Sequence, residues 1–425
     1  MDYQHNVTEQ EVMSLIISQL VAYGYSAVAQ NVAATTGATN DLSPSNKLSE
    51  LIAIARAQQE NADGSEEEDE SDSRREQDHD SLQANIEHDQ ASARGFDPDA
   101  VNTAQPAPPP HYIQHYYTQH KGPCLTAAFS TDGRFAATGS QDASLKVLDV
   151  YKMKKRTGDA GDKPVIKTLY DHTASVNDLS FHPNGLVLAS CSDDMSIKLF
   201  DLSKSGVKRS FRYLQDTYVV NSISFHPSGE YLLAGTEDAA VRIYDVKSLQ
   251  CFTSGRAQDA HRAAITQIRY SKNGRMFATS SADGSIRIWD AVSGFCTKVI
   301  EAGHGGATVS SVRFMQNEKY VLSAGLDSTL RLWDITSGRA VAQYVGHRNV
   351  AQKLQPTFTY NDQHVLIGDE ASTDVLCWDT QTTQLVSRIT SHNNLVRTVV
   401  SSPFDSGILT CSNDYRARYF MTYTD

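Results

Sequence analysis

The sequence predicts an all-β propeller of seven blades, preceded by a small helical domain and an acidic linker. Two observations support this prediction: a repeat near 45 residues, and a charge asymmetry between the front of the chain and the rest. The repeat is marked by aromatic residues followed by aspartate, and successive aspartates lie 44 or 45 residues apart. A weaker copy precedes these endings and a degenerate one follows, which makes seven. The five clear endings are Phe200-Asp201, Tyr244-Asp245, Trp289-Asp290, Trp333-Asp334 and Trp378-Asp379.

The charge is unevenly distributed along the 425 residues. The whole chain has a net charge of -12, but residues 1 to 110 hold 20 acidic and 5 basic side chains, against 30 and 33 in residues 111 to 425. The acidity therefore belongs to the front of the chain. The repeat region is nearly neutral, and its small positive excess is too weak to indicate a nucleic-acid footprint.

Residues 1–59 are predicted to form a small helical domain. Thr8 and Glu11 make a capping box at the start of an amphipathic helix over residues 8 to 23. A second short helix follows Ser26, and a third begins at Ser43, where the next residue is proline. Three short helices bury little core by themselves, so self-association would cover their apolar stripe. The alternative is that this domain packs on the propeller.

Residues 60–110 are predicted to be a disordered linker. Acidic residues dominate its first part, including the run from Glu66 to Glu70, and a proline cluster lies near its end. Low hydrophobicity, high charge and prolines disfavour a packed core. The linker would tether the helical domain. Alternatively, its acidic run attracts a basic partner.

Each repeat of this length with a Trp-Asp ending is typical of one four-stranded blade of a WD-repeat propeller. Inside the repeats a histidine precedes an aspartate by 22 residues in four cases and by 23 in one. We expect each set to form a buried chain from carboxylate to imidazole to hydroxyl to indole. A nucleophilic triad needs one accessible site, so near-copies in several blades indicate a structural role. The expected members are His120, Asp142, His172, Ser190, Asp194, His261, Thr279, Asp283, Trp289, His304, Ser323, Asp327, Trp333, His392, Thr410 and Asp414.

Three repeats depart from this pattern. The third has Asp216 at the histidine position, and the first two replace tryptophan with Leu148 and Phe200, which predicts incomplete networks. In the sixth, Asp374 lies 27 residues after the histidine, which predicts an altered turn over residues 368 to 373. The first repeat also carries an insertion, Lys152 to Lys163, expected to be a loop between its last two strands or a basic contact site.

The propeller domain is predicted to span residues 111–425. The last repeat stops at Tyr419-Phe420 and leaves no room for a fourth strand. Residues 112–118 alternate aromatic and polar side chains and can supply that strand. Joining the two ends in one blade removes open sheet edges.

Motifs for other chemistry are missing from the sequence. It contains no Gly-x-x-x-x-Gly-Lys-Ser/Thr loop, no His-Glu-x-x-His and no Gly-x-Ser-x-Gly. We therefore assign no catalytic residue, no metal and no cofactor. No apolar run reaches the length of a membrane span and no signal peptide follows Met1, so we expect an intracellular protein without a membrane contact.

In its whole order the chain resembles the WD-repeat subunits of cleavage stimulation factor, a complex of messenger RNA 3'-end processing. The specific matches are Leu15 to Leu20 followed by Gly24-Tyr25, Val165 to His172, Ser222 to Gly229, and Cys411 to Arg418. The acidic linker and the insertion at Lys152 to Lys163 are not covered.

The resemblance implies a non-enzymatic nuclear scaffold. In this family the N-terminal helices form a homodimer, the propeller binds a helical-repeat scaffold subunit, and a third subunit reads the RNA. The resemblance also brings in the RNA polymerase II C-terminal domain as a partner. By position, the implied dimer contacts are Leu15, Ile16, Leu20, Tyr23, Tyr25 and Val28.

Two other classes remain open at this stage. Helical dimerisation domains also precede propellers in substrate receptors of ubiquitin ligases and in microtubule regulators, although no F-box or docking helix is evident in residues 1 to 60. Direct RNA binding by the propeller is the second alternative. Against it, the sequence shows no clustered aromatic and basic surface.

Overall fold

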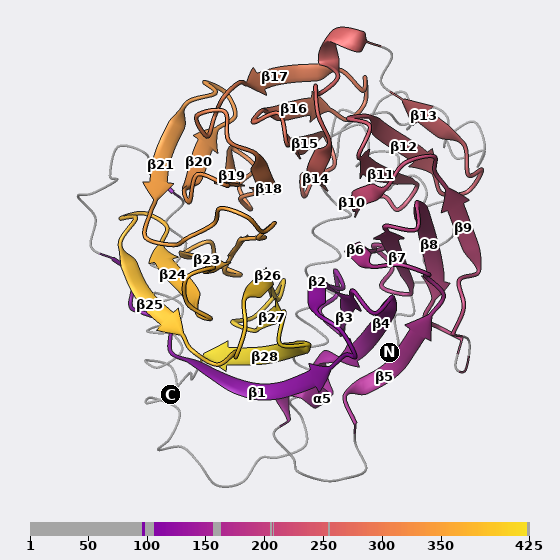
Figure 1. The fold of residues 1–425 in the computed structure, drawn as a ribbon, viewed down its shortest axis with the longest axis horizontal. Coiled ribbons are helices and arrows are strands. Elements are labelled where there is room, and N and C mark those ends of the chain that lie inside the picture. The colour runs from indigo at the N-terminus through magenta and orange to yellow at the C-terminus, as the bar shows by residue number, and fades with distance from the viewer. Residues whose placement is uncertain are drawn as a thin grey trace, which may run out of the picture. The chain divides into compact units, whose positions relative to one another are not determined.

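The repeat region forms a ring of seven four-stranded sheets, as the sequence predicts. The computed structural model describes residues 96–97, 106–155, 163–204, 206, 208–253 and 256–422. In Figure 1 the sheets are arranged radially, with the first strand of each blade nearest the central axis and the last on the rim. All strand pairs within these sheets are antiparallel, and neighbouring strands follow one another in sequence except at the ring closure.

The strands of the first three blades have the following bounds. Blade 1 contains β2 (Cys124–Phe129), β3 (Phe135–Ser140), β4 (Ser144–Asp149) and β5 (Val165–Tyr170). Blade 2 contains β6 (Val176–Phe181), β7 (Val187–Ser192), β8 (Ser196–Asp201) and β9 (Arg212–Gln215). Blade 3 contains β10 (Val220–Phe225), β11 (Tyr231–Thr236), β12 (Val241–Asp245) and β13 (Cys251–Thr253).

The remaining blades follow the same order. Blade 4 contains β14 (Ile265–Tyr270), β15 (Met276–Ser281), β16 (Ile286–Asp290) and β17 (Cys296–Ile300), after the 3-10 turn η2 (Ala257–Asp259). Blade 5 contains β18 (Val309–Phe314), β19 (Tyr320–Gly325), β20 (Leu330–Asp334) and β21 (Ala340–Tyr344). Blade 6 contains β22 (Thr357–Phe358), β23 (His364–Gly368), β24 (Val375–Asp379) and β25 (Leu385–Ile389).

Blade 7 is built from both ends of the repeat region. Its inner three strands are β26 (Val396–Ser401), β27 (Ile408–Ser412) and β28 (Arg416–Thr422), and its outer strand is β1 (Tyr112–Gln119). The register runs from Tyr112 opposite Thr422 to Gln119 opposite Arg416, with one irregularity after Gln114. This pairing closes the ring with backbone hydrogen bonds and leaves no unpaired edge between the first and last blades.

The apolar core lies between the blades. Each of the seven buried clusters found in the described part of the chain combines residues of two consecutive blades. Trp378 and Tyr320 meet in the cluster between blades 5 and 6, and Leu148 and Tyr419 meet between blades 1 and 7. Each sheet is therefore covered on both faces. This explains why inner strands such as β19 read as continuous buried runs instead of alternating ones.

The insertion in blade 1, which was expected to be a loop, begins with a short helix. Residues Val150–Lys154 form a short helix, α5, because Asp149 caps its first turn and Val150 and Met153 are buried beside Tyr419. Lys154 forms an ion pair with Asp405. Residues 156 to 162 lie outside the described part of the chain.

The C-terminal end of the predicted linker contacts the propeller. The Phe96 ring packs edge-on against Tyr320, with ring centroids 5.0 Å apart, and joins the cluster between blades 5 and 6. Further along, the Ala107 amide donates a 2.8 Å hydrogen bond to Asp379. These contacts, a partly buried aromatic ring and a backbone hydrogen bond, involve segments far apart in sequence, which composition alone does not reveal. Residues that precede position 111 therefore also contact the propeller.

The predicted helical domain, residues 1–59, and most of the predicted linker lie outside the described residues. Within the described ranges no helix is long and apolar enough to cross a membrane.

Candidate functional site: blade networks and the edge of blades 2 and 3

Blades 4 and 5 contain complete hydrogen-bonded chains. In blade 4 the Trp289 indole donates to Thr279 at 2.9 Å, and the Thr279 oxygen lies 2.6 Å from His261 Nε2. His261 Nδ1 lies 3.3 Å from an oxygen of Asp283. Because an indole only donates and a carboxylate only accepts, Thr279 donates to Nε2, and Nδ1–H faces two acceptors, the Ser285 hydroxyl at 2.9 Å and Asp283.

Blade 5 repeats this arrangement. Trp333 donates to Ser323 at 2.8 Å, Ser323 lies 2.7 Å from His304 Nε2, and His304 Nδ1 lies 2.9 Å from Asp327. Burial lowers the pKa of His304, as it does that of His261, so both imidazoles are held in the neutral form. The chain therefore joins two strands, the turn between them and the loop before the blade without burying an imidazolium.

For four of the aspartates in these networks, hydrogen bonding outweighs burial and decides the direction of the pKa shift. Burial alone would raise the pKa of Asp283, but hydrogen bonds from His261, Ser285 and two backbone amides hold it well below its usual range. The same balance, with the paired histidine, lowers the pKa values of Asp142, Asp194 and Asp414. Each turn thus holds an ionised carboxylate that accepts several hydrogen bonds.

Blades 1, 2 and 7 have the chain without the indole. His172 lies 2.7 Å from Ser190 and 2.8 Å from Asp194, and His392 lies 2.7 Å from Thr410 and 2.9 Å from Asp414. In blade 1, His120 contacts Thr138 and Ser144, each at 2.9 Å, and Asp142 lies 3.8 Å away. Thr138 and Ser144 were missed from the sequence, although both lie at the spacings that mark Thr279 and Ser285 in blade 4.

Blade 3 replaces the chain with a different network. Asp216 accepts a 2.9 Å hydrogen bond from the Tyr244 hydroxyl and lies 2.7 Å from Arg242 Nε, while Arg242 also contacts Asp238 at 2.9 Å. Ala234 stands in strand register where other blades have the hydroxyl. A phenol is polar at its far end, so Tyr244 reaches the carboxylate directly. Blade 3 is therefore a substituted network and not merely an incomplete one.

In blade 6 the histidine has lost its partners. Neither ring nitrogen of His347 forms a hydrogen bond with any residue that the structure describes, and Ile367 occupies the hydroxyl position. The ring packs against Trp378, with centroids 5.7 Å apart, and burial lowers the pKa of His347 to about 4. Asp369, not Asp374, accepts the 2.7 Å hydrogen bond from the backbone after the histidine. The turn between β23 and β24 is longer than in the other blades, in the region that the sequence indicates.

These networks cannot act as nucleophilic sites. The hydroxyl groups that contact the histidines belong to residues that solvent does not reach, including Ser190, Thr279, Ser323 and Thr410. A substrate could not approach them without opening the sheets. We infer that the chains satisfy buried polar groups and fix the strands of a blade in register.

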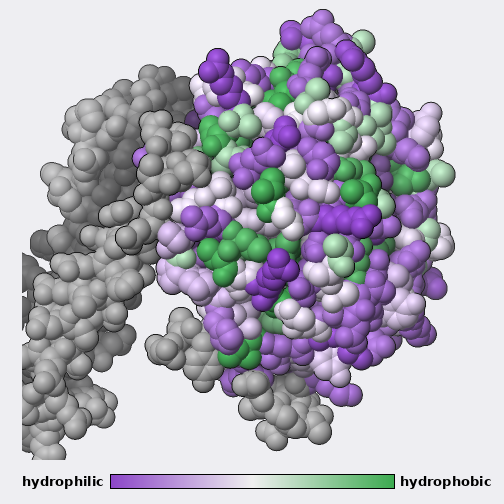
Figure 2. Space-filling view, turned by 60° about the vertical axis from the view of Figure 1, so that its left-hand side comes forward, coloured by the Kyte–Doolittle hydropathy of each residue, from purple (hydrophilic) through white to green (hydrophobic). Residues whose placement is uncertain are grey.

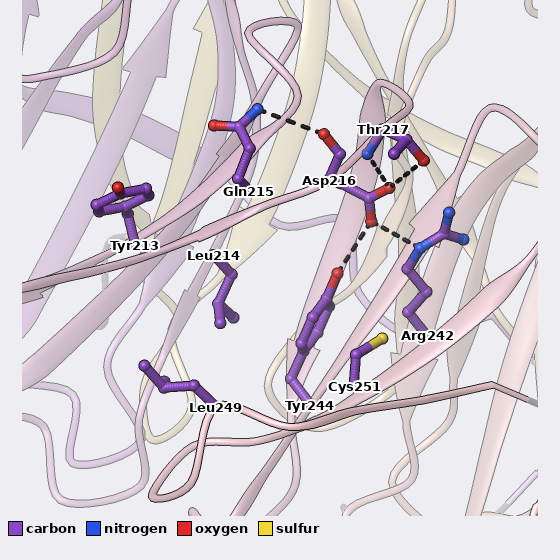
Figure 3. A pocket seen from close by; sticks show the side chains of 9 residues that line it. All are labelled: Tyr213, Leu214, Gln215, Asp216, Thr217, Arg242, Tyr244, Leu249 and Cys251. Carbon is purple, nitrogen blue, oxygen red and sulfur yellow. Dashed lines mark hydrogen bonds and ion pairs between the residues drawn. The ribbon is translucent and has the colours of Figure 1, made fainter.

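An open pocket of about 450 Å³ lies at the rim between blades 2 and 3. Figure 3 shows Asp216, Tyr244 and Arg242 at its polar end, and Tyr213, Leu214 and Leu249 at its apolar end. A second pocket of about 400 Å³ adjoins it, and Tyr213 and Gln215 line both. The pocket is shaped by the short outer strand β13, which has three residues and leaves the rim uncovered beside β9.

The cysteine thiol in the wall of this pocket is not activated as a nucleophile. Burial raises the pKa of the Cys251 thiol in its wall, so that group is protonated near neutral pH. Beside it, the segment from Lys208 to Tyr213 alternates basic and aromatic residues, and Phe211 and Tyr213 are 47% and 64% exposed. This clustered aromatic and basic surface corrects the expectation that none exists. The sequence contains this surface as the run Lys-Arg-Ser-Phe-Arg-Tyr, but the exposure of its side chains could not be inferred from the sequence alone.

On the side of the ring opposite this pocket, the surface mixes apolar and polar residues. On the side that carries β21 and β25, the visible apolar residues form separate patches divided by polar ones (Figure 2). The edge of blades 2 and 3, which we call the blade 2–3 edge and define by Phe211, Tyr213, Tyr218 and Phe252, has four exposed aromatic rings.

Comparisons with known proteins agree with this architecture. Residues 7–60 match the family "Cleavage stimulation factor subunit 1, dimerisation domain", and residues 112–149 and 163–201 match "WD domain, G-beta repeat". Residues 213–423 match "Nucleolar protein 10-like, N-terminal domain". Cleavage stimulation factor subunit 50 of Arabidopsis thaliana is 37% identical over 97% of this chain and 95% of its own length. The chain belongs to the cleavage stimulation factor subunit 50 family.

More distant relatives match smaller parts of this subunit 50 family member. The nuclear distribution protein nudF of Aspergillus niger is 23% identical over 79% of the chain and 66% of its own length. Pre-mRNA-processing factor 17 of Mus musculus is 24% identical over 74% of the chain and 54% of its own length. Both are much less similar than the subunit 50 relative.

The residues predicted to form the dimer contact lie within the segment that matches the dimerisation-domain family. The dimerisation-domain match over residues 7–60 of this subunit 50 family member includes the six contacts that the resemblance implies, Leu15, Ile16, Leu20, Tyr23, Tyr25 and Val28. All six lie outside the residues that the structure describes, so their individual roles stay predictions. In the described part of the chain, no three metal-ligating side chains gather into a group that could hold an ion.

Proposed function

We propose that this protein is a non-catalytic scaffold subunit of the cleavage stimulation factor complex in the nucleus. It dimerises through residues 1–59 and binds a helical-repeat scaffold subunit through the propeller, which supports pre-mRNA 3'-end cleavage and polyadenylation. The observation that carries this proposal is that one relative, a cleavage stimulation factor subunit, matches 97% of the chain, so dimerisation domain and propeller occur together.

Dimerisation of the scaffold would double the number of partners in one assembly. Two copies of the chain would bring two copies of every bound partner into one assembly. An RNA-reading subunit would then bind its second site at a high effective concentration, without any new contact. The protein itself would contact RNA only indirectly. The RNA polymerase II C-terminal domain is a further partner in this proposal.

The blade 2–3 edge is our candidate for the surface that binds the scaffold subunit. Exposed aromatic rings supply large contact area at low conformational cost and are enriched at interfaces. Tyr213 separates the two adjoining pockets, and a side chain of the partner can enter on either side of it. The ion pair between Arg242 and Asp216 forms the polar end of the first pocket.

A binding assay with the full-length chain tests this proposal. The helical-repeat subunit is immobilised and the parent chain is compared with a Phe211→Ala/Tyr213→Ala variant. The matched control is Phe404→Ala, an exposed aromatic residue on blade 7. We expect the double variant to lose about tenfold or more in affinity, as for interface aromatic residues. Equal binding by all three chains would exclude this edge.

The same surface favours one second candidate, direct binding of single-stranded RNA. Aromatic rings stack on bases and basic side chains contact phosphates, and the segment Lys208 to Tyr213 offers both. Fluorescence anisotropy with a GU-rich RNA and the isolated chain tests it. Binding that weakens steeply with salt and requires Tyr213 would support direct contact.

An adaptor role in another assembly, such as a ubiquitin ligase, is the remaining alternative. Affinity capture from nuclear extract separates the two. Recovery of 3'-end processing factors supports the proposal, whereas recovery of ligase components would replace it.

A further inference from the structure

Basic side chains from several blades meet at the centre of the ring. The first strands of the blades surround the axis in Figure 1. Arg269 of blade 4 reaches Asp178 of blade 2 with two contacts, of 2.6 and 3.1 Å. Lys353, in the segment leading into blade 6, lies 3.4 Å from the Asn221 carbonyl of blade 3. Because these blades are not neighbours, the side chains cross the interior of the ring.

Positive charge exceeds negative charge at this place. Arg269, Arg313, Lys353 and Arg397 form what we call the central cation cluster. Asp178, whose side chain is 1% exposed, is the carboxylate paired with Arg269. The charge of Glu370 acts on Arg397, but its oxygens accept hydrogen bonds from three backbone amides of residues 350 to 352.

Arg313 is the residue that this arrangement leaves without a partner. Its Nε is shielded from solvent and has no hydrogen-bond acceptor, and its guanidinium forms no ion pair with any residue in the described ranges. Burial lowers the pKa of Arg313 to about 10, and the charge of Arg269 lowers it further against the opposing effect of Asp178. Burial likewise lowers the pKa of Lys353 to about 8. Arg313 as a whole residue is only partly buried, so a counter-charge can reach its guanidinium from solvent and offset the cost of the shielded, unpaired Nε.

We propose that the central cation cluster binds one small oxyanion of the phosphate or sulfate type. Guanidinium groups present parallel N–H donors that match two oxygens of such an anion. Arg313 supplies the free donors, and Lys353 and Arg397 add charge. The site is small, because Lys353 and Arg269 already span the interior. The bound anion would link blades 4, 5, 6 and 7 through charged hydrogen bonds.

Thermal unfolding and calorimetry of the full-length chain test this site with inorganic phosphate as the probe. Phosphate is titrated against chloride at matched ionic strength. We expect the parent chain to be stabilised by phosphate in a saturable manner. Arg313→Met should weaken phosphate binding about tenfold or more, since a charge-assisted hydrogen-bond pair is lost. Without phosphate this variant should be at least as stable as the parent, because it removes an unpaired charge.

The matched control is Arg275→Met, which changes an exposed arginine in the turn between β14 and β15 and should bind phosphate as the parent does. If Arg313→Met fails to fold, Lys353→Met replaces it with the same expectation. Competition by inositol hexakisphosphate would assign the site to a phosphate ester, and lack of competition to the free anion. Equal stabilisation of parent and variant, or none beyond that of chloride, would overturn the proposal.

Discussion

The hydroxyl of Tyr244 donates a 2.9 Å hydrogen bond to the carboxylate of Asp216, the residue that replaces the histidine of the other six blades. The Asp216 side chain is 3% exposed and also pairs with Arg242. One blade has therefore exchanged a neutral chain of imidazole, hydroxyl and indole for a charged contact between a phenol, a carboxylate and a guanidinium. The exchange places fixed charge at the blade 2–3 edge, where the pocket opens.

Tyr244→Phe should destabilise the propeller by about 2 kcal/mol, because a buried carboxylate loses one of its donors. Urea unfolding monitored by circular dichroism measures the loss. Tyr231→Phe is the control, since Tyr231 is 40% exposed and its hydroxyl forms no hydrogen bond among the described residues. Equal midpoints for the two variants would show that the bond to Asp216 contributes nothing.

Asp283→Ala should cost roughly 1 to 3 kcal/mol, because it removes one of the two acceptors near His261 Nδ1 and leaves only the Ser285 hydroxyl. It also removes the acceptor of backbone and Ser285 donors in the turn. Thermal melts compare this variant with Glu301→Ala, which changes an exposed residue in the loop after the same blade. A melt like that of the parent would contradict the structural role.

His347 should make the propeller less stable in mild acid. Unfolded, this histidine takes up a proton as the pH falls through about 6.5, whereas the folded residue, with a pKa of about 4, stays neutral. The unfolded state therefore binds more protons between these values, and stability is lost as pH falls. Between pH 7 and 5 we expect a loss of roughly 2 kcal/mol from this group.

The comparison for this effect is His347→Phe, which keeps a ring against Trp378 and cannot titrate. Urea midpoints at pH 7 and 5 should fall less for the variant than for the parent. Parallel losses in the two proteins would assign the acid sensitivity to other groups.

A chain that begins at residue 120 should fail to form a stable propeller, whereas one that begins at residue 106 should fold. The first lacks β1, which leaves β28 as an open edge, and the second keeps all seven register pairs between the two strands. Soluble yield and cooperative melting measure the difference. A stable, monomeric product from the shorter chain would show that ring closure does not need β1.

Leu20→Asp in the full-length chain should convert a dimer into a monomer, because it places a charge in the apolar stripe of residues 8 to 23. Light scattering at tens of micromolar measures the mass. Gln19→Asp, on the neighbouring polar position, is the control. Identical masses for both variants would exclude Leu20 from the dimer contact.

The repeat predicted the fold well because its signals are local and recur. The spacing of His261 and Asp283 follows from one turn geometry used again and again, and the missing fourth strand after Phe420 required a strand from the other end of the domain. The blade networks were predictable for the same reason in blades 2, 4, 5 and 7.

Other features depended on contacts between segments distant in sequence. Phe96 lies in a stretch whose composition favours disorder, yet it packs on Tyr320 more than two hundred positions later. The partner of Asp216 could not be inferred either, because the histidine pattern says nothing of a tyrosine in the tryptophan position. Arg313 reads as an ordinary strand residue, and its isolation depends on which side chains the other blades send inward.

The pairing of β1 with β28 also bears on how the chain is made. During synthesis β1 emerges before any blade exists, and its hydrogen-bonding partner β28 is made only after the strands of the first six blades. Until then a strand with three tyrosines waits unpaired beside growing sheets, able to join the wrong edge or another nascent chain. Nascent copies of this protein should therefore need chaperone protection until β28 has been synthesised, however stable the finished ring is.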